Sequence, residues 1–334
     1  MARIGFDGLM ISPHGKGHAR SERHAAEALA ARGEHELVVF VREDVTVAGA
    51  ETVRVDGLTL DWELRGVVRA AREHRLDAFV SLSERLPLRG GPPFVVWLFE
   101  SPLHRIRQNR SSGAPLRHRG SDLVTQLLWK RSLRRAAHVA MGSQATEREA
   151  LAAIPELAGR TSVVYPGLAP GFSPGPSSRE GTYAFHLGSH DPRDNTATAI
   201  EAARLANVEL LVAGAAGNLG RVTDEELVDL YRGAAAFVDP SLYEGFGYGV
   251  LEAMACGAPV VAGDVTSIPE VVGDAGLLCD PRSPRELAAA IRRVIDEPEL
   301  ARTLRERGFE RAARFTWEDT AVGLSAAIRA SLAT

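Results

Sequence analysis

Two glutamates, Glu244 and Glu252, flank a glycine-rich stretch in the second half of the chain. Between them Gly245, Gly247 and Gly249 allow the backbone to approach a ligand closely. The stretch is typical of a turn followed by a helix that begins near Gly247, and a helix start directs free N–H groups and a positive dipole end at an anion. Ionised carboxylates on either side suit the hydroxyl pairs of sugars. The pattern therefore predicts a site for a sugar diphosphate.

This stretch resembles the signature of the family 4 glycosyltransferases, which have the GT-B fold: a Glu-Gly-Phe-Gly turn and a second Glu eight positions after the first. The resemblance covers nearly the whole second half, through Gly214, Gly220-Arg221-Val222, Pro259-Val260-Val261, Pro269-Glu270-Val271 and Gly276-Leu277-Leu278. It implies a retaining enzyme that transfers a hexosyl-type sugar from a nucleotide-diphosphate sugar to an acceptor hydroxyl.

The resemblance also implies a role for each residue of the donor site. Glu244 is expected to bind hydroxyls of the donor sugar and to act in catalysis, and Glu252 is expected to bind the ribose. The main chain at Arg221 and Val222 is expected to frame the base. The remaining donor contacts are expected around the diphosphate, at Gly245, Phe246, Gly247, Tyr248, Gly249 and Val250.

The loop after the first strand of the second half departs from the family pattern. Ser189 and Asp194 stand where relatives have an Arg and a Lys against the diphosphate. Arg193 is the candidate substitute, because Arg can bind a phosphate through two parallel hydrogen bonds, although most such arginines are exposed turn residues. We assign Ser189 and Arg193 to the donor site and Arg193 to catalysis. The alternative function is a non-catalytic or partner-dependent subunit that binds a sugar nucleotide at a degenerate phosphate site.

The first half offers fewer candidates. Relatives often have a His after the strand at 94–98, whereas this chain has Glu100, with His104 nearby. Glu100 is a candidate for proton transfer or for orienting the acceptor hydroxyl, and the alternative is a loop-capping role. The loop Gly15-Lys16-Gly17-His18 precedes the first helix, where relatives have a mobile loop against the donor, so Gly17 is a predicted donor contact. It is not a P-loop, because Gly17 stands where Ser or Thr is required.

The sequence predicts no metal and no cofactor beyond the nucleotide sugar, which is UDP-, GDP-, ADP- or dTDP-linked. Other sugar transferases hold a divalent metal through an Asp-x-Asp motif, and this chain has none. His14 and His18 have the spacing of a metal pair, but the glycines between them break helical geometry. We interpret them as loop histidines.

Apolar runs rich in Val and Phe alternate with stretches of helical period along all 334 residues. This rhythm predicts an α/β protein with parallel sheets, and with the resemblance it predicts GT-B, two Rossmann-like doubly wound domains facing a cleft. The expected strands are 4–6, 37–41, 78–82, 94–98, 139–141, 163–165, 183–187, 210–212, 236–238 and 260–262. The breaker-rich stretch around 166–181 marks the boundary. We expect an acceptor-binding domain at 1–166, a linker at 167–181, a nucleotide-sugar domain at 182–315 and a helix at 316–334 that crosses back to the first domain.

Two patterns predict helix starts in the second half. Thr223 with Glu226, and Ser283 with Glu286, have the spacing of a capping box, in which each side chain satisfies a backbone N–H of the first turn.

Charge and composition limit the partners. A net charge of −4 argues against nucleic acid. Only two cysteines, no apolar run of about 18 residues and no signal-like start predict a cytoplasmic protein. The segment 103–135 is a local exception, with nine Arg or Lys against the single acid Asp122. It is either a solvated surface or a weak contact with the inner membrane face. The acceptor is a sugar, a lipid or a natural product.

Overall fold

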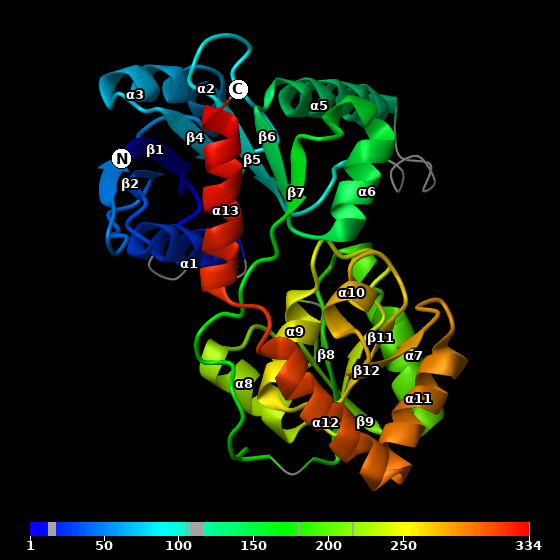
Figure 1. Cartoon of the computed structure of the whole chain (residues 1–334). Helices are drawn as coiled ribbons and strands as arrows, with labels where there is room; N and C mark the ends of the chain where they lie inside the picture. Colours follow the sequence, from blue (N-terminus) through cyan, green and yellow to red (C-terminus); the bar gives the residue numbers. More distant parts are fainter. Residues whose placement is uncertain (13–17, 105, 107–115, 180, 216, 334) are drawn as a thin grey trace. The chain divides into compact units, whose positions relative to one another are not determined.

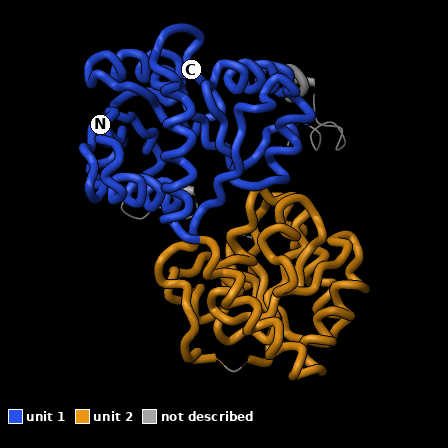
Figure 2. Tube along the Cα trace, viewed as in Figure 1, with its two compact units in different colours: residues 1–167, 316–334 blue, residues 168–315 orange. Residues whose placement is uncertain are grey.

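The computed structural model describes residues 1–12, 18–104, 106, 116–179, 181–215 and 217–333, without the side chains of 18 and 116–121 (Figure 1). The chain divides into two compact units (Figure 2). Unit 1 comprises 1–167 and 316–334, and unit 2 comprises 168–315. Each unit is a parallel sheet with helices on both faces, which confirms the predicted α/β fold with two Rossmann-like units.

Unit 1 is built on a seven-stranded parallel sheet in the order β3-β2-β1-β4-β5-β6-β7. The register places Ile4 beside Leu37 on one side and Ala78 on the other. The strands are nearly continuous apolar runs because both faces of the sheet are covered. They are β1 (Ala2–Asp7), β2 (His35–Val41), β3 (Glu51–Arg54), β4 (Ala78–Ser81), β5 (Phe94–Leu98), β6 (His138–Met141) and β7 (Thr161–Val163).

Helices cover the two faces of this sheet with separate cores. One face packs against α1 (His18–Ala31) and α13 (Trp317–Leu332). The other packs against the π-helix η1 (Trp62–Gly66), α3 (Val67–Glu73), α5 (Leu116–Arg135) and α6 (Gln144–Ala153). Two short turns, α2 (Thr59–Asp61) and η2 (Pro155–Leu157), also belong to this unit.

The last helix of the chain belongs to unit 1. The Thr320 hydroxyl donates to the Tyr165 carbonyl at 2.7 Å, and the Ser325 hydroxyl lies 2.6 Å from the Glu34 carboxylate and 2.9 Å from His35 Nε2. These contacts join α13 to segments that lie 155 to 291 residues earlier in the chain.

Unit 2 is built on a five-stranded parallel sheet in the order β12-β11-β10-β8-β9. Its strands are β8 (Tyr183–Leu187), β9 (Glu209–Ala213), β10 (Ala236–Asp239), β11 (Val260–Gly263) and β12 (Gly276–Cys279). Its helices are η3 (Pro192–Asp194), α7 (Thr196–Ala206), α8 (Asp224–Gly233), α9 (Tyr248–Cys256), α10 (Ile268–Val272), α11 (Pro284–Asp296) and α12 (Pro298–Ala312). Helices α7 and α11 cover one face, and on the other Tyr231 of α8 packs 5.2 Å from the rings of both Phe185 and Phe237.

Several predicted details differ from the structure. The strands β3 and β12 were not expected, and β7 begins and ends two residues before the predicted 163–165. Part of the predicted linker packs within unit 2, where the Ser177 hydroxyl donates to Asp229 at 2.9 Å. The capping box at Thr223 is complete, whereas Glu286 accepts from the backbone of Asp280 instead of Ser283. Within the described ranges, no helix combines the length and apolar character that crossing a bilayer requires.

Candidate active site

The topology of unit 2 selects one end of its sheet for a ligand. The strand order places β8 between β9 and β10, so connections leave β8 and β10 toward opposite sides. In open α/β sheets, ligands bind beyond the carboxyl ends of the strands at such a switch point. The loops that follow β8 and β10 there, 188–195 and 240–247, contain six of the thirteen predicted donor residues.

The turn after β10 is held at Glu244. Its backbone N–H donates to Thr266 Oγ1 at 3.0 Å, and its carbonyl accepts from Ser267 Oγ at 2.8 Å. Gly247 has φ 103° as the N-cap of α9, and a Cβ there would lie 2.8 Å from Ile268. A residue with a side chain is therefore strained at this position. The turn thus fixes the N-terminus of α9, where the positive end of the helix dipole favours an anion.

Glu244 lies in an acidic environment. Burial raises the pKa of its carboxyl to about 8, the Asp239 carboxylate acts in the same direction, and a hydrogen bond from Ser241 opposes both. Asp239 is itself buried and accepts from the Ser241 hydroxyl at 2.6 Å. Most Glu244 side chains therefore hold a proton at neutral pH.

The loop after β8 lies against this turn, because the Leu242 N–H donates to the Arg193 carbonyl at 2.7 Å. The Arg193 guanidinium is paired with Asp191, with Nη2 2.8 Å and Nε 2.9 Å from Oδ2. The Ser189 N–H donates to Asp194 Oδ2 at 2.7 Å. The loop thus brings Arg193 and Ser189 to the predicted site, with the Arg193 charge already facing a carboxylate.

Two glycines join the ends of β8 and β9. Gly214 has φ 109°, and a Cβ on it would lie 2.1 Å from the Gly188 carbonyl oxygen. Its N–H donates to the Gly220 carbonyl at 2.7 Å, which leads the chain into Arg221 and Val222 before α8. Close backbone packing therefore sets the path of the segment predicted to frame a base.

Glu252 lies on α9 and is only 5% exposed. The Tyr231 hydroxyl lies 3.4 Å from its Oε2, at the long end of a hydrogen bond. Burial and the nearby Glu252 carboxylate both raise the pKa of Tyr231. Phe246, between the two glutamates, is buried against Tyr248 and Phe315 at 5.2 and 5.6 Å. The aromatic packing therefore supports the segment that carries both carboxylates.

Unit 1 has three buried carboxylates that the sequence analysis missed: Asp7, Glu22 and Glu63. Burial, followed by the charge of Glu63, raises the pKa of Asp7 to about 7, and burial, followed by the charge of Asp7, raises that of Glu22 to about 9. Glu22 accepts from the Met10 N–H at 3.1 Å, and Asp7 Oδ1 has no hydrogen-bond partner among the described residues. Asp7 ends β1 at the switch point between β1 and β4, a position that the strand order of an α/β sheet would have indicated.

The remaining predicted residues are placed only in part. Glu100 is half-buried two residues beyond β5, at the same edge of the sheet as Asp7, and His104 is half-buried. The loop with His14, Lys16 and Gly17 lies outside the described residues. Among those that are described, His, Cys, Asp and Glu side chains form no group of three or more suited to a metal ion.

A family model described as glycosyl transferases group 1 matches residues 209–311, from the first residue of β9 to the last turn of α12. The match includes the glycine-rich turn and both of its glutamates. The second unit is therefore similar to the glycosyl transferases group 1 family over these residues.

The chain is also similar in sequence to bacterial sugar transferases. The chain is 37% identical over 163 residues to O-antigen chain mannosyltransferase B of Escherichia coli, covering 41% of this chain and 43% of that protein. It is 41% identical over 109 residues to a D-inositol 3-phosphate glycosyltransferase of Segniliparus rotundus, covering 32% and 24%. The chain therefore matches less than half the length of these relatives.

The fold of both units is that of known GT-B structures. Sucrose-phosphate synthase from Thermosynechococcus elongatus aligns with a TM-score of 0.77 at 20% identity, over 98% of each chain. Anabaena HepE, solved with UDP-glucose, aligns with a TM-score of 0.70 at 18% identity, over 98% of this chain and 100% of that one.

Proposed function

We propose that this chain is a retaining glycosyltransferase that moves a hexosyl sugar from a nucleotide-diphosphate donor to an acceptor hydroxyl without a metal ion. One observation carries the proposal: Glu244 and Glu252 stand on the fixed turn and the helix that follow β10, at the switch point of the sheet. That position offers an anion the first turn of α9 and offers sugar hydroxyls a carboxyl group on either side.

The proposed reaction needs no protein nucleophile. The bond from the anomeric carbon to the diphosphate oxygen breaks, and the acceptor oxygen forms its bond on the same face. The acceptor proton passes to the departing phosphate oxygen, which balances the charge. The N–H groups of α9 and the Arg193 guanidinium are proposed to stabilise the charge that develops on the diphosphate.

The raised pKa of Glu244 fits this role. A protonated Glu244 can both donate to and accept from sugar hydroxyls, and it adds no negative charge beside the diphosphate. Asp239, Asp191 and Asp194 already lie on the same two loops or the strand before them. A neutral Glu244 therefore lowers the electrostatic cost of binding an anion there.

The relatives suggest which donors to test first. The Escherichia coli relative is named a mannosyltransferase, and the HepE structure contains UDP-glucose. We therefore propose a mannosyl or glucosyl donor. The acceptor is proposed to bind unit 1 at the carboxyl edge of its sheet, where Asp7, Glu22 and Glu100 lie.

The second candidate function is a sugar-nucleotide-binding subunit without turnover. The ion pair between Arg193 and Asp191 favours it, because the one Arg of the loop is engaged before a diphosphate arrives. Under this alternative, the protein binds a nucleotide sugar but releases no nucleotide from it.

We further propose that segment 103–135 makes weak contact with an anionic membrane surface on the cytoplasmic side. Its helix α5 exposes Leu123, Val124 and Leu127, and Lys130, Arg131 and Arg134 follow at helical spacing. An apolar row that continues into cations suits the interface of an anionic bilayer.

Calorimetric titration with UDP, GDP, ADP and dTDP and their common sugars tests the proposed donor site. We expect one nucleotide to bind and to raise the melting temperature. Glu252→Gln removes the ribose acceptor charge with little change in volume and is expected to weaken binding at least about tenfold. Glu225→Gln, on the exposed start of α8, is the matched control and is expected to bind like the wild type. If Glu252→Gln and Glu225→Gln bind the nucleotide with equal affinity, Glu252 does not contact it.

A further inference from the structure

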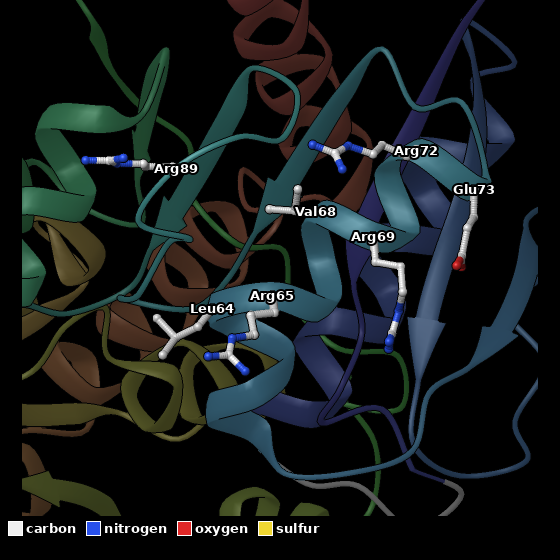
Figure 3. A pocket seen from close by; sticks show the side chains of 7 residues that line it. All are labelled: Leu64, Arg65, Val68, Arg69, Arg72, Glu73 and Arg89. Carbon is white, nitrogen blue, oxygen red and sulfur yellow. The ribbon is translucent and has the colours of Figure 1, made fainter.

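A hollow of about 550 Å³ lies on unit 1, in the opposite half of the chain from the proposed donor turn. Its lining comes from η1, from α3 and from the loop between β4 and β5 (Figure 3). The lining residues are Leu64, Arg65, Val68, Arg69, Arg72, Glu73 and Arg89. Four arginines against one glutamate make it a strongly basic surface.

Arg65 of η1 and Arg69 and Arg72 of α3 stand four and three residues apart, a spacing at which helical side chains are neighbours. Like charges at this spacing repel each other and destabilise a helix by about 0.2–0.5 kcal/mol per pair. An anion bound among them would remove that repulsion.

None of the four arginine side chains has a hydrogen bond or an ion pair with a described residue. Many other arginines of the chain are engaged: Arg54 pairs with Asp44, Arg204 with Glu201, and Arg302 with Glu299 and Glu306. Glu73 pairs with none of the lining arginines either. Four guanidinium groups without a described protein partner therefore line the hollow.

The loop that carries Arg89 is held by hydrogen bonds from arginines of α5. Arg131 donates to the Leu88 carbonyl at 3.0 Å, and Arg135 donates to the carbonyls of Leu88 and Gly90. Gly90 has φ 72°, and a Cβ on it would lie 3.3 Å from Val68 and 4.0 Å from Arg72. The arginines of α5 thus hold the loop near α3. The arginine side chains of the hollow make no such hydrogen bond with a described residue.

We propose that this hollow is a binding site for a phosphate-bearing group, separate from the donor site. Guanidinium groups bind phosphate oxygens through paired hydrogen bonds, and several of them match the charge of a diphosphate or a clustered phosphate headgroup. The half-exposed Leu64 and Val68 add apolar surface for the carbon part of the ligand. The phosphate belongs either to a soluble molecule or to a lipid headgroup. The site does not depend on glycosyl transfer.

The test uses the full chain and the double variant Arg65→Gln/Arg69→Gln. Gln keeps the helix propensity of Arg, and loss of like-charge repulsion is expected to leave the melting temperature unchanged or slightly raised. The matched control is Arg204→Gln/Arg302→Gln, which removes two paired arginines from unit 2. Inorganic pyrophosphate is titrated by calorimetry, and phosphatidylcholine vesicles with and without phosphatidic acid are tested by cosedimentation.

Pyrophosphate affinity is expected to fall at least about tenfold in Arg65→Gln/Arg69→Gln and to stay unchanged in the control. That result indicates a soluble ligand. Loss of binding to phosphatidic acid vesicles alone indicates a lipid headgroup and also supports the site. The proposal is overturned if the hollow variant retains the affinity of the control for both probes, since any phosphate binding then occurs elsewhere.

Discussion

The Arg193 guanidinium is paired with Asp191, two residues earlier in the same loop, at 2.8 Å between Nη2 and Oδ2. The two side chains are 28% and 35% exposed, and pairs this open to water contribute only about 0–1 kcal/mol. A diphosphate can therefore displace Asp191 at small cost. We therefore expect the pair to weaken binding of the proposed donor without preventing it.

The first prediction concerns that pair. Asp191→Asn keeps the side-chain oxygen that accepts the Arg193 N–H at 2.9 Å but removes the competing charge. Affinity for the nucleoside diphosphate is expected to rise about two- to fivefold, and Arg193→Ala is expected to lower it. Calorimetry measures both. If neither variant changes the affinity, Arg193 does not contact the diphosphate.

Glu244 predicts a pH dependence of donor binding. Its pKa of about 8 keeps it neutral at pH 7 and ionised at pH 9, where its charge repels a diphosphate. Nucleoside diphosphate affinity is expected to fall across this range in the wild type and to fall less in Glu244→Gln, which carries no charge at either pH. Parallel pH profiles for the two proteins would contradict the assignment.

The third prediction tests the anchor of the turn. Ser267 is fully buried, and Ser267→Ala leaves the Glu244 carbonyl without its 2.8 Å donor. The free energy of unfolding is expected to fall by about 1–2 kcal/mol, and donor affinity is expected to fall with it because the turn loosens. Ser283→Ala removes the N-cap of α11 at a similar cost of about 1 kcal/mol and is expected to leave donor affinity unchanged. Equal affinities in the two variants would show that the anchor does not shape the site.

Glu22 predicts a pH dependence of stability in unit 1. Its pKa rises from 4.5 to about 9 on folding, so the folded state takes up a proton that the unfolded state releases. Stability is therefore lost as pH rises from about 4.5 to 9. Glu22→Gln is expected to unfold like the wild type at pH 5 and to be more stable by at least about 1 kcal/mol at pH 9. The exposed Glu43→Gln serves as control in denaturant titrations. A wild type whose free energy of unfolding is the same at pH 9 as at pH 5 would contradict the raised pKa of Glu22.

The sequence predicts most of the sheet and the glycine-rich turn because these depend on local patterns. Runs such as 94–98 and 236–238 are apolar on both faces and are strands in the structure. The edge strands lack this pattern: β3 has one apolar residue among its four, and β12 is only partly buried. An edge strand needs less apolar surface, because it forms by backbone pairing with its neighbour: β3 pairs with β2, and β12 pairs with β11.

The missed features of the site arise from contacts between distant segments. Thr266 and Ser267 look like ordinary loop residues until the fold brings them to Glu244, 22 and 23 residues earlier. Likewise, Asp191 is a plausible capping residue in sequence, and only the structure shows its carboxylate on Arg193. Asp7 and Glu22 come together because β1 and α1 are adjacent in the fold.

Glycosyl transfer itself can be followed by proton NMR. The protein is mixed with a nucleotide-sugar donor, with either water or an added acceptor as the receiving group, and the anomeric proton signals are recorded over time. We expect release of the nucleoside diphosphate and a sugar product with the anomeric configuration of the donor. Turnover is expected to be strongly reduced in Glu252→Gln but not in Glu225→Gln. An inverted product would contradict the proposed mechanism. A donor that binds and is never cleaved would contradict the enzyme and leave the sugar-nucleotide-binding subunit.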